Sequence, residues 1–97
     1  MTEERTLAAP EELGLETQQE FRRSAVALLQ ALPENARLTI DMSRTRSIDS
    51  TGLNALILIR RSATERRQIV RLEGVGEELR YALARTKLDG LLSSESP

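Results

Sequence analysis

Ser50 is the residue of this chain best placed for chemistry, because it lies where a strand gives way to a helix. An alternating segment ends at Met42, a polar turn follows, and an apolar helix opens at about Thr51. Unpaired backbone N–H groups and the positive end of the helix dipole favour a negative group at such a position. A phosphate on Ser50 would be held there and would add about −1.5 to −2 charges to the surface. The pattern therefore predicts a phosphorylation switch at Ser50.

The residues next to Ser50 leave other roles open. Thr51 is the alternative phosphate acceptor, since its hydroxyl also lies at the helix start. Either hydroxyl can instead serve only as a helix cap, which needs no phosphorylation. For Asp49 the simpler role is a hydrogen-bond anchor of the turn, and the alternative is a carboxylate that faces a partner. Gly52 favours the close approach of another backbone.

The composition of the chain argues against an enzyme. Its 97 residues include no cysteine, no histidine and only one lysine, Lys87, so the commonest general base and the commonest metal ligand are missing. A serine hydrolase would have only Lys87 as a base, and the glycine-rich loop of nucleotide hydrolases is absent. Asp41 and Asp49 alone are weak evidence for a Mg²⁺ site. We therefore expect no catalysis, no cofactor and no metal.

Charge and hydropathy limit the partners that the chain can bind. The formal net charge is −1, and the arginine doublets are interspersed with glutamates, which argues against a nucleic-acid surface. No apolar run approaches the roughly 18 residues of a membrane span, and the acidic first residues do not resemble a secretory signal. We expect one cytoplasmic domain over residues 1–92 and a disordered tail over 93–97. The domain should bind another protein, as a monomer or a weak homodimer.

Periodicity predicts the elements that precede the central turn. Residues 1–16 predict an edge strand followed by an irregular return. Thr17 and Glu20 have the spacing of a capping box, and the helix that they begin ends at Pro33. The inward face of this helix consists of apolar residues at spacings of three and four, namely Phe21, Ala25, Leu28, Leu29 and Leu32.

The rest of the chain completes a small mixed α/β fold. Segment 38–42 predicts a central strand with one buried face, because apolar and polar residues alternate along it. A short strand over 69–72 and a third helix follow, and this order predicts a largely parallel sheet with helices on one face. The apolar residues expected to close the core here are Val75, Leu79, Ala82, Leu83, Leu88, Leu91 and Leu92.

The second helix, from about Thr51 to Glu65, carries more apolar surface than one inward stripe needs. Its core stripe is expected to consist of Leu53, Leu56 and Ile57. A separate stripe begins beside Ser50 and consists of Thr51, Asn54, Leu58 and Arg61. We interpret this stripe as a partner-binding surface, the alternative being that Leu58 packs on a neighbouring helix.

The central turn resembles the signature of STAS domains. The resemblance rests on Asp41-Met42-Ser43 and on Asp49-Ser50-Thr51-Gly52-Leu53, and it extends more loosely over residues 15–92. Membership of that family implies a small mixed sheet with helices on one side and no enzymatic activity. Thr45 and Arg46 stand where family members usually have an apolar residue.

Two branches of the family resemble the chain and imply different partners. Bacterial anti-sigma factor antagonists share the Asp-Ser-(Ser/Thr)-Gly-Leu pattern. This resemblance implies that Ser50 accepts phosphate from an anti-sigma factor that is also a kinase, and that the phosphorylated protein then releases this anti-sigma factor. The expected contact residues are Asp49, Ser50, Thr51, Gly52, Asn54, Leu58 and Arg61. The short leading segment is also similar to the STAS subunit of lipid-transport ABC complexes, which docks on the ATPase. In that branch contacts without phosphorylation would be made by Ser50, Thr51, Asn54 and Leu58. The sequence favours the anti-sigma factor antagonist, and the transporter subunit is the alternative.

Overall fold

The computed structural model describes residues 3–85 of the chain, and strands and helices are interspersed along them. In chain order the elements are β1 (Glu4–Ala8), β2 (Glu12–Leu13), α1 (Gln18–Ala31), β3 (Arg37–Asp41), β4 (Ser47–Ile48), α2 (Ser50–Glu65), β5 (Ile69–Glu73) and α3 (Glu77–Arg85). No helix within these residues is both long and apolar enough to span a membrane. The predicted tail over 93–97 and the expected core residues Leu88, Leu91 and Leu92 lie outside the described residues.

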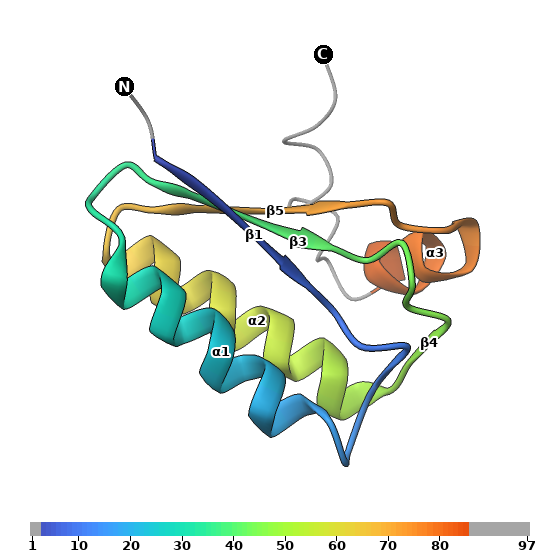
Figure 1. Ribbon diagram of the computed structural model, residues 1–97. Helices are drawn as coiled ribbons and strands as arrows, with labels where there is room; N and C mark the ends of the chain where they lie inside the picture. Colours follow the sequence, from blue (N-terminus) through green and yellow to red (C-terminus); the bar gives the residue numbers. More distant parts are fainter. Residues whose placement is uncertain (1–2, 86–97) are drawn as a thin grey trace.

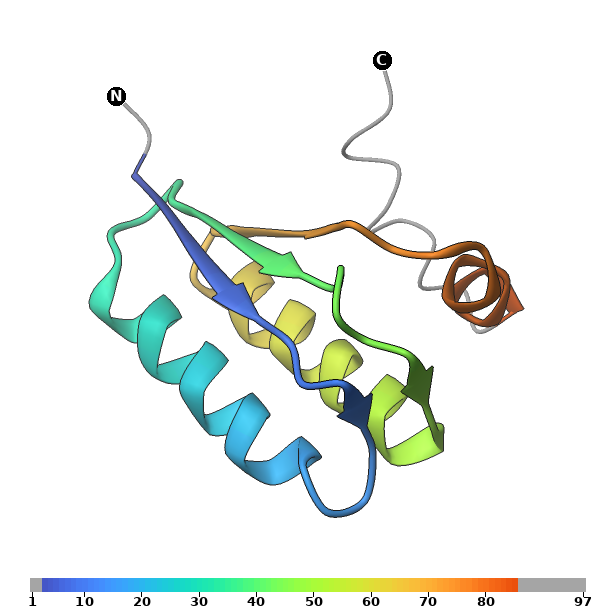
Figure 2. The ribbon, with the colours of Figure 1, turned by 45° about the vertical axis from the view of Figure 1, so that its right-hand side comes forward.

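Within the described residues the strands form two parallel sheets, in agreement with the predicted α/β fold and its largely parallel pairing. β1, β3 and β5 make a three-stranded sheet with β3 in the centre, and the short strands β2 and β4 pair separately. Figure 1 shows α1 and α2 side by side on one face of the sheet, while α3 lies beyond the carboxyl ends of the strands. Figure 2 shows the same arrangement from another side. The expected edge strand is therefore β1, and β2 is the irregular return.

The core lies between the sheet and the pair α1 and α2. The inward face predicted for α1 is confirmed, because its predicted residues are buried except Leu28, which is half-buried and packs against the core. The core residues from the sheet are Leu38, Ile40, Val70 and Leu72, to which Met42 is added just after β3. Thr39 is also only 5 % exposed, contrary to the expectation of a single buried face for this strand. It occupies the middle of the central strand, with Thr6 and Arg71 as its register neighbours.

The core stripe of α2 differs from the predicted one. Its buried residues are Gly52, Ala55, Leu56, Ile59 and Ala63. The prediction for Leu56 is therefore correct and Leu53 packs partly against the core, but the prediction for Ile57 is wrong, since 37 % of this residue is exposed. Each helical residue turns by about 100°, so a stripe centred between Leu56 and Ile59 carries Ile57 away from the sheet.

The predicted capping box at the start of α1 does not form. Thr17 precedes the helix, as expected, but its backbone already has helical dihedral angles, with φ −113° and ψ −17°, and its side chain makes no cap hydrogen bond. Its hydroxyl instead donates to the carbonyl oxygen of Glu12 at 2.6 Å and accepts from the N–H of Gly14 at 3.0 Å. A capping side chain normally extends from a β-region backbone toward the helix. Thr17 therefore closes the loop before α1 rather than the helix itself.

Gln68 ties the end of α1 to the start of β5. Its side-chain Nε2 donates to the carbonyl oxygens of Leu29, Leu32 and Pro33 at 2.7, 3.0 and 3.2 Å. Carbonyls at a helix carboxyl end lose their regular helical partners, and this buried amide adds a donor beside the backbone N–H groups of Leu32 and Ala36, which reach Leu29 and Pro33.

Candidate functional site

The start of α2 is capped by Asp49. Its backbone is extended, with φ −109° and ψ −174°, and its Oδ1 accepts the N–H of Gly52 at 3.0 Å. The same oxygen accepts the hydroxyl of Thr51 at 2.6 Å. These bonds give Asp49 the anchoring role that the sequence favoured, and they place Ser50 as the first residue of the helix.

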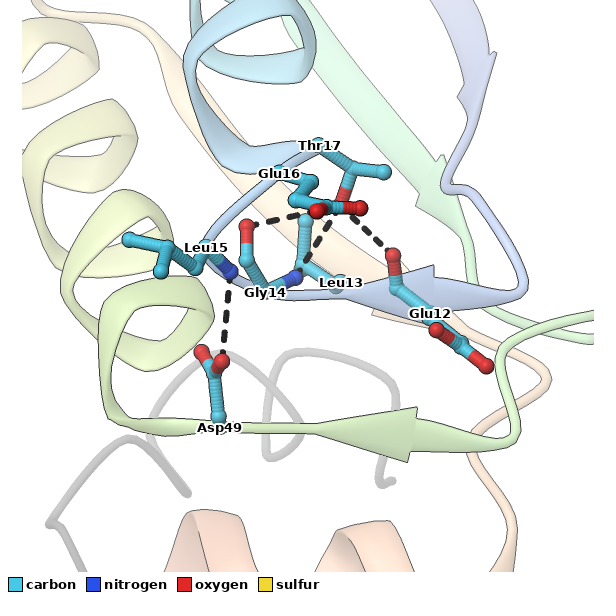
Figure 3. Close-up of a pocket in the computed structure, with 7 residues that line it drawn as sticks. All are labelled: Glu12, Leu13, Gly14, Leu15, Glu16, Thr17 and Asp49. Atoms are coloured by element: carbon cyan, nitrogen blue, oxygen red, sulfur yellow. Dashed lines mark hydrogen bonds between the residues drawn. The ribbon is translucent and has the colours of Figure 1, made fainter.

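The second carboxylate oxygen of Asp49 reaches a different part of the chain. Oδ2 accepts the backbone N–H of Leu15 at 3.2 Å, which joins the loop between β2 and α1 to the start of α2 (Figure 3). The hydroxyl of Thr51 is the main cause that lowers the pKa of Asp49 below its ordinary value, followed by the N–H of Gly52, with a smaller effect from Leu15. Asp49 is therefore a charged clasp between two segments that are far apart in the sequence.

Two glycines allow these segments to approach closely. A Cβ on Gly52 would overlap the carbonyl oxygen of Leu13 and lie 2.9 Å from a side-chain carbon of Ile48. A Cβ on Gly14 would come within 2.6 Å of Asp49 Oδ2. The close backbone approach predicted at Gly52 is thus present, and it brings Leu13 against the first turn of α2.

The two candidate phosphate acceptors have different surroundings. Thr51 is half-buried and its hydroxyl is engaged by Asp49. Ser50 is exposed, and within residues 3–85 its side chain has no hydrogen-bond partner. Of the two hydroxyls, that of Ser50 is the one free to meet another molecule.

An exposed stripe runs from Ser50 along the outer face of α2. At helical spacing it contains Ser50, Asn54, Ile57 and Arg61, all of them exposed, whereas Leu58 is half-buried. The structure thus places Asn54 and Arg61 on one surface with Ser50, and it puts Ile57 where the sequence suggested Leu58. A shallow hollow of about 330 Å³ lies at the far end of the stripe, lined by Ile57, Arg60, Arg61, Thr64 and Glu65.

The turn before β4 is held by hydrogen bonds within the protein. Asp41 Oδ1 accepts the N–H of Ser43 at 3.0 Å, and the bonds to Ser43 lower the pKa of Asp41. Thr45 is buried and its hydroxyl donates to the carbonyl oxygen of Pro10 at 2.9 Å, while Arg46 is exposed. A polar residue can therefore be buried at position 45, because the hydroxyl of Thr45 is hydrogen-bonded. Within residues 3–85, no three acidic residues gather in a way that would hold a metal ion.

Comparison with known proteins identifies the family. The model described as "Mlab, STAS domain" matches residues 2–93. The chain belongs to the STAS family. No curated protein matches it. The STAS signature seen in the sequence, from Asp49 to Leu53, is thus the segment that forms the clasp and the first turn of α2.

Solved structures show the same fold. A crystal structure of a sulfate transporter family protein from Wolinella succinogenes aligns with a TM-score of 0.79 and 23 % identity, over 95 % of this STAS chain and 73 % of the other. The murine Solute Carrier 26 family member A9 anion transporter, in the inward-facing state, aligns with a TM-score of 0.76 and 15 % identity. That alignment covers 88 % of this chain and 14 % of the transporter.

Sequence reasoning gave no role to Leu15. The structure exposes 72 % of this residue and places it beside the clasp of this STAS domain. The available signal was an apolar residue between Gly14 and Glu16, in a stretch too short for a second full strand. The contact with Asp49 spans 34 positions of sequence, so no local pattern indicates it.

Proposed function

We propose that this STAS domain is a cytoplasmic docking subunit that binds the ATPase of a lipid-transport ABC complex. The observation that carries the proposal is the exposed surface at the start of α2, where Ser50 and Asn54 stand free beside a rigid clasp. Binding to a preformed surface costs less conformational entropy than binding to a mobile one. The family match and the occurrence of the fold in two proteins named as transporters further support a transport partner.

The stripe suits docking better than catalysis. It combines a hydroxyl, an amide, an apolar side chain and a guanidinium in the residues Ser50, Asn54, Ile57 and Arg61. Such a mixture offers a partner apolar contact area and directional hydrogen bonds. Asp49, the carboxylate that precedes Ser50, already accepts hydrogen bonds from three donors of its own chain.

A second function, anti-sigma factor antagonist, is favoured by one specific observation. The hydroxyl of Ser50 is exposed and unpartnered among the described residues, whereas that of Thr51 is bound to Asp49. An anti-sigma factor kinase would therefore find Ser50 accessible at the start of α2. A phosphate there would add about −1.5 to −2 charges next to Asp49, and a partner that docks on this surface would be released.

One experiment separates the two functions. The tagged protein is co-expressed with the ATPase of the lipid-transport complex, and separately incubated with anti-sigma factor kinases and ATP before mass spectrometry. Stable co-purification with the ATPase and unmodified Ser50 and Thr51 support the docking subunit. Phosphate on Ser50 together with loss of the bound kinase supports the antagonist instead.

Variants of Ser50 give an independent readout. Ser50→Asp should abolish binding of an anti-sigma factor but only moderately weaken binding of an ATPase, since only the first partner responds to charge as a signal. Ser50→Ala is the matched control, because it removes the hydroxyl without adding charge. If Ser50→Ala alone abolishes binding of the unphosphorylated protein, Ser50 is a direct contact and the switch is contradicted.

A further inference from the structure

We propose that Leu15 is the apolar anchor of the docking surface, and that it enters an apolar socket of the partner ATPase beside a basic side chain. This inference rests on the proposed function and names the part of the surface that dominates binding. It adds the loop between β2 and α1 to a surface that would otherwise consist of α2 alone.

The loop that carries Leu15 is fixed although its side chain is exposed. The carbonyl oxygen of Gly14 accepts the N–H groups of Thr17 and Gln18 at 3.1 and 2.8 Å, and Thr17 is bonded in turn to Glu12. Asp49 holds the N–H of Leu15 itself. An apolar side chain that is 72 % exposed on such a loop is already in one backbone conformation, so a partner gains its burial at little entropic cost.

Leu15 differs from the other large apolar residues that are exposed within residues 3–85. Tyr81 is 69 % exposed, but the guanidinium of Arg85 lies 5.8 Å from the centre of its ring. Ile57 and Ile69 are only 37 % and 47 % exposed. Of these four residues, Leu15 is the one whose backbone N–H is hydrogen-bonded to Asp49. Figure 3 shows its side chain pointing away from Glu12 and Thr17. It is therefore an exposed apolar side chain on a fixed backbone, and its burial by a partner would be favourable.

The surroundings of Leu15 indicate the charge of the partner. A hollow of about 310 Å³ is lined by Glu12, Leu13, Gly14, Leu15, Glu16, Thr17 and Asp49. Of these described residues three carry carboxylates and none is basic. A partner that covers Leu15 must meet this acidic rim, and a lysine or arginine next to its apolar socket would satisfy it. Binding should consequently weaken as salt concentration rises.

The test compares two substitutions of exposed aliphatic residues. The dissociation constant of the ATPase is measured by calorimetry for the wild type, Leu15→Ser and the matched control Ile69→Ser, which changes an exposed residue on β5. We expect Leu15→Ser to weaken binding by about 10- to 100-fold and Ile69→Ser to change it less than about twofold. Circular dichroism and thermal unfolding of each variant verify the fold.

A second variant tests the charge. Glu16→Lys should weaken binding at low salt, and the difference from wild type should shrink at high salt. If Leu15→Ser binds as well as the wild type while Ser50→Asp binds less well, the anchor is refuted and docking survives. If the wild type does not bind the ATPase, both the proposed function and the anchor are refuted.

Discussion

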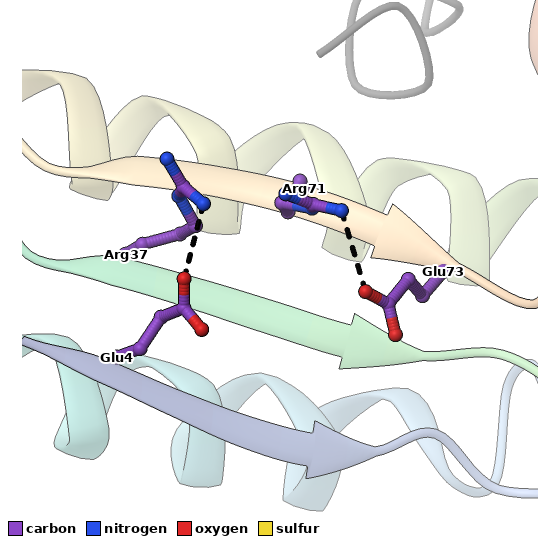
Figure 4. Close-up of polar contacts among 4 residues, drawn as sticks. All are labelled: Glu4, Arg37, Arg71 and Glu73. Atoms are coloured by element: carbon purple, nitrogen blue, oxygen red, sulfur yellow. Dashed lines mark hydrogen bonds and ion pairs between the residues drawn. The ribbon is translucent and has the colours of Figure 1, made fainter. Parts of the chain in front are cut away.

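Two groups of exposed carboxylates in this STAS domain are used in different ways. At the start of α2, Asp49 accepts hydrogen bonds from two backbone N–H groups and one hydroxyl, and so joins two segments. On the sheet face opposite α1 and α2, Glu4 pairs with Arg37 at 3.0 Å and Glu73 with Arg71 at 3.3 Å (Figure 4). The carboxylate side chains of both pairs are more than half exposed, at 56 % and 53 %.

The difference shows where charge determines structure. An exposed ion pair contributes about 0–1 kcal/mol, because water screens it and two long side chains must be ordered. Asp49 is also exposed, but it is short, and its partners are two backbone N–H groups and one hydroxyl that the fold already holds. Its loss would change the position of the Leu15 loop and of Ser50 together. Substitutions on the sheet face should therefore change the stability little, whereas substitutions at the start of α2 should lower it.

The largest effect is expected at Gly52. Gly52→Ala places a methyl group against the carbonyl oxygen of Leu13 and should destabilise the protein by about 2–3 kcal/mol, because backbone must move to make room. Urea denaturation measures the change. The matched control is Gly76→Ala, since nothing lies within 4 Å of a Cβ at that position. Equal stability of the two variants would contradict the close packing between Gly52 and Leu13 at the start of α2.

Removal of the clasp should have the next largest effect. Asp49→Ala leaves the N–H groups of Gly52 and Leu15 without their acceptor, and loss of a helix cap typically lowers the melting temperature of a small domain by roughly 4–8 °C. Thermal unfolding measures this change, and hydrogen exchange at the Leu15 amide reports on the loop. Asp49→Asn is the control, because an asparagine also caps helices. If exchange at Leu15 is unchanged in Asp49→Ala, the clasp does not hold the loop.

The sequence predicted this junction better than the surfaces around it. The change from an alternating strand to an apolar helix placed Asp49 and Ser50 correctly at the start of α2, because that signal is local. The helical period does not specify which side of a broadly apolar helix faces the sheet, so Ile57 was assigned to the core in error. Contacts that join distant segments were not predictable. Gln68 reaches Leu29 across 39 positions of sequence.

The dependence of stability on pH should distinguish the clasp from an uncharged cap. Hydrogen bonds from Thr51, Gly52 and Leu15 hold the pKa of Asp49 below its ordinary value of 3.8. The stabilisation from this group is therefore complete above that value and is lost as the pH falls through the lower pKa of the folded state. Asp49→Asn should remove this loss, so the difference between wild type and variant should shrink on acidification.

A second carboxylate, Asp41, needs a control of its own. The pKa of Asp41 is also lowered, through its bonds to Ser43, so Asp41→Asn should remove a separate part of the acid dependence. Denaturant midpoints of the three proteins between about pH 3 and pH 7 measure the contributions. Parallel curves for wild type and Asp49→Asn would show that the charge of Asp49 does not stabilise the fold.

The smallest effect is expected on the sheet face. Glu4→Gln removes the charge that pairs with Arg37 while keeping the shape of the side chain, and it should change the stability by less than about 0.5 kcal/mol. Glu73→Gln, at the other pair, should behave alike. Urea denaturation at low and high salt measures both, and high salt should reduce the difference further. A loss of stability as large as that of Asp49→Ala would mean that these ion pairs stabilise the protein as much as the cap of α2 does.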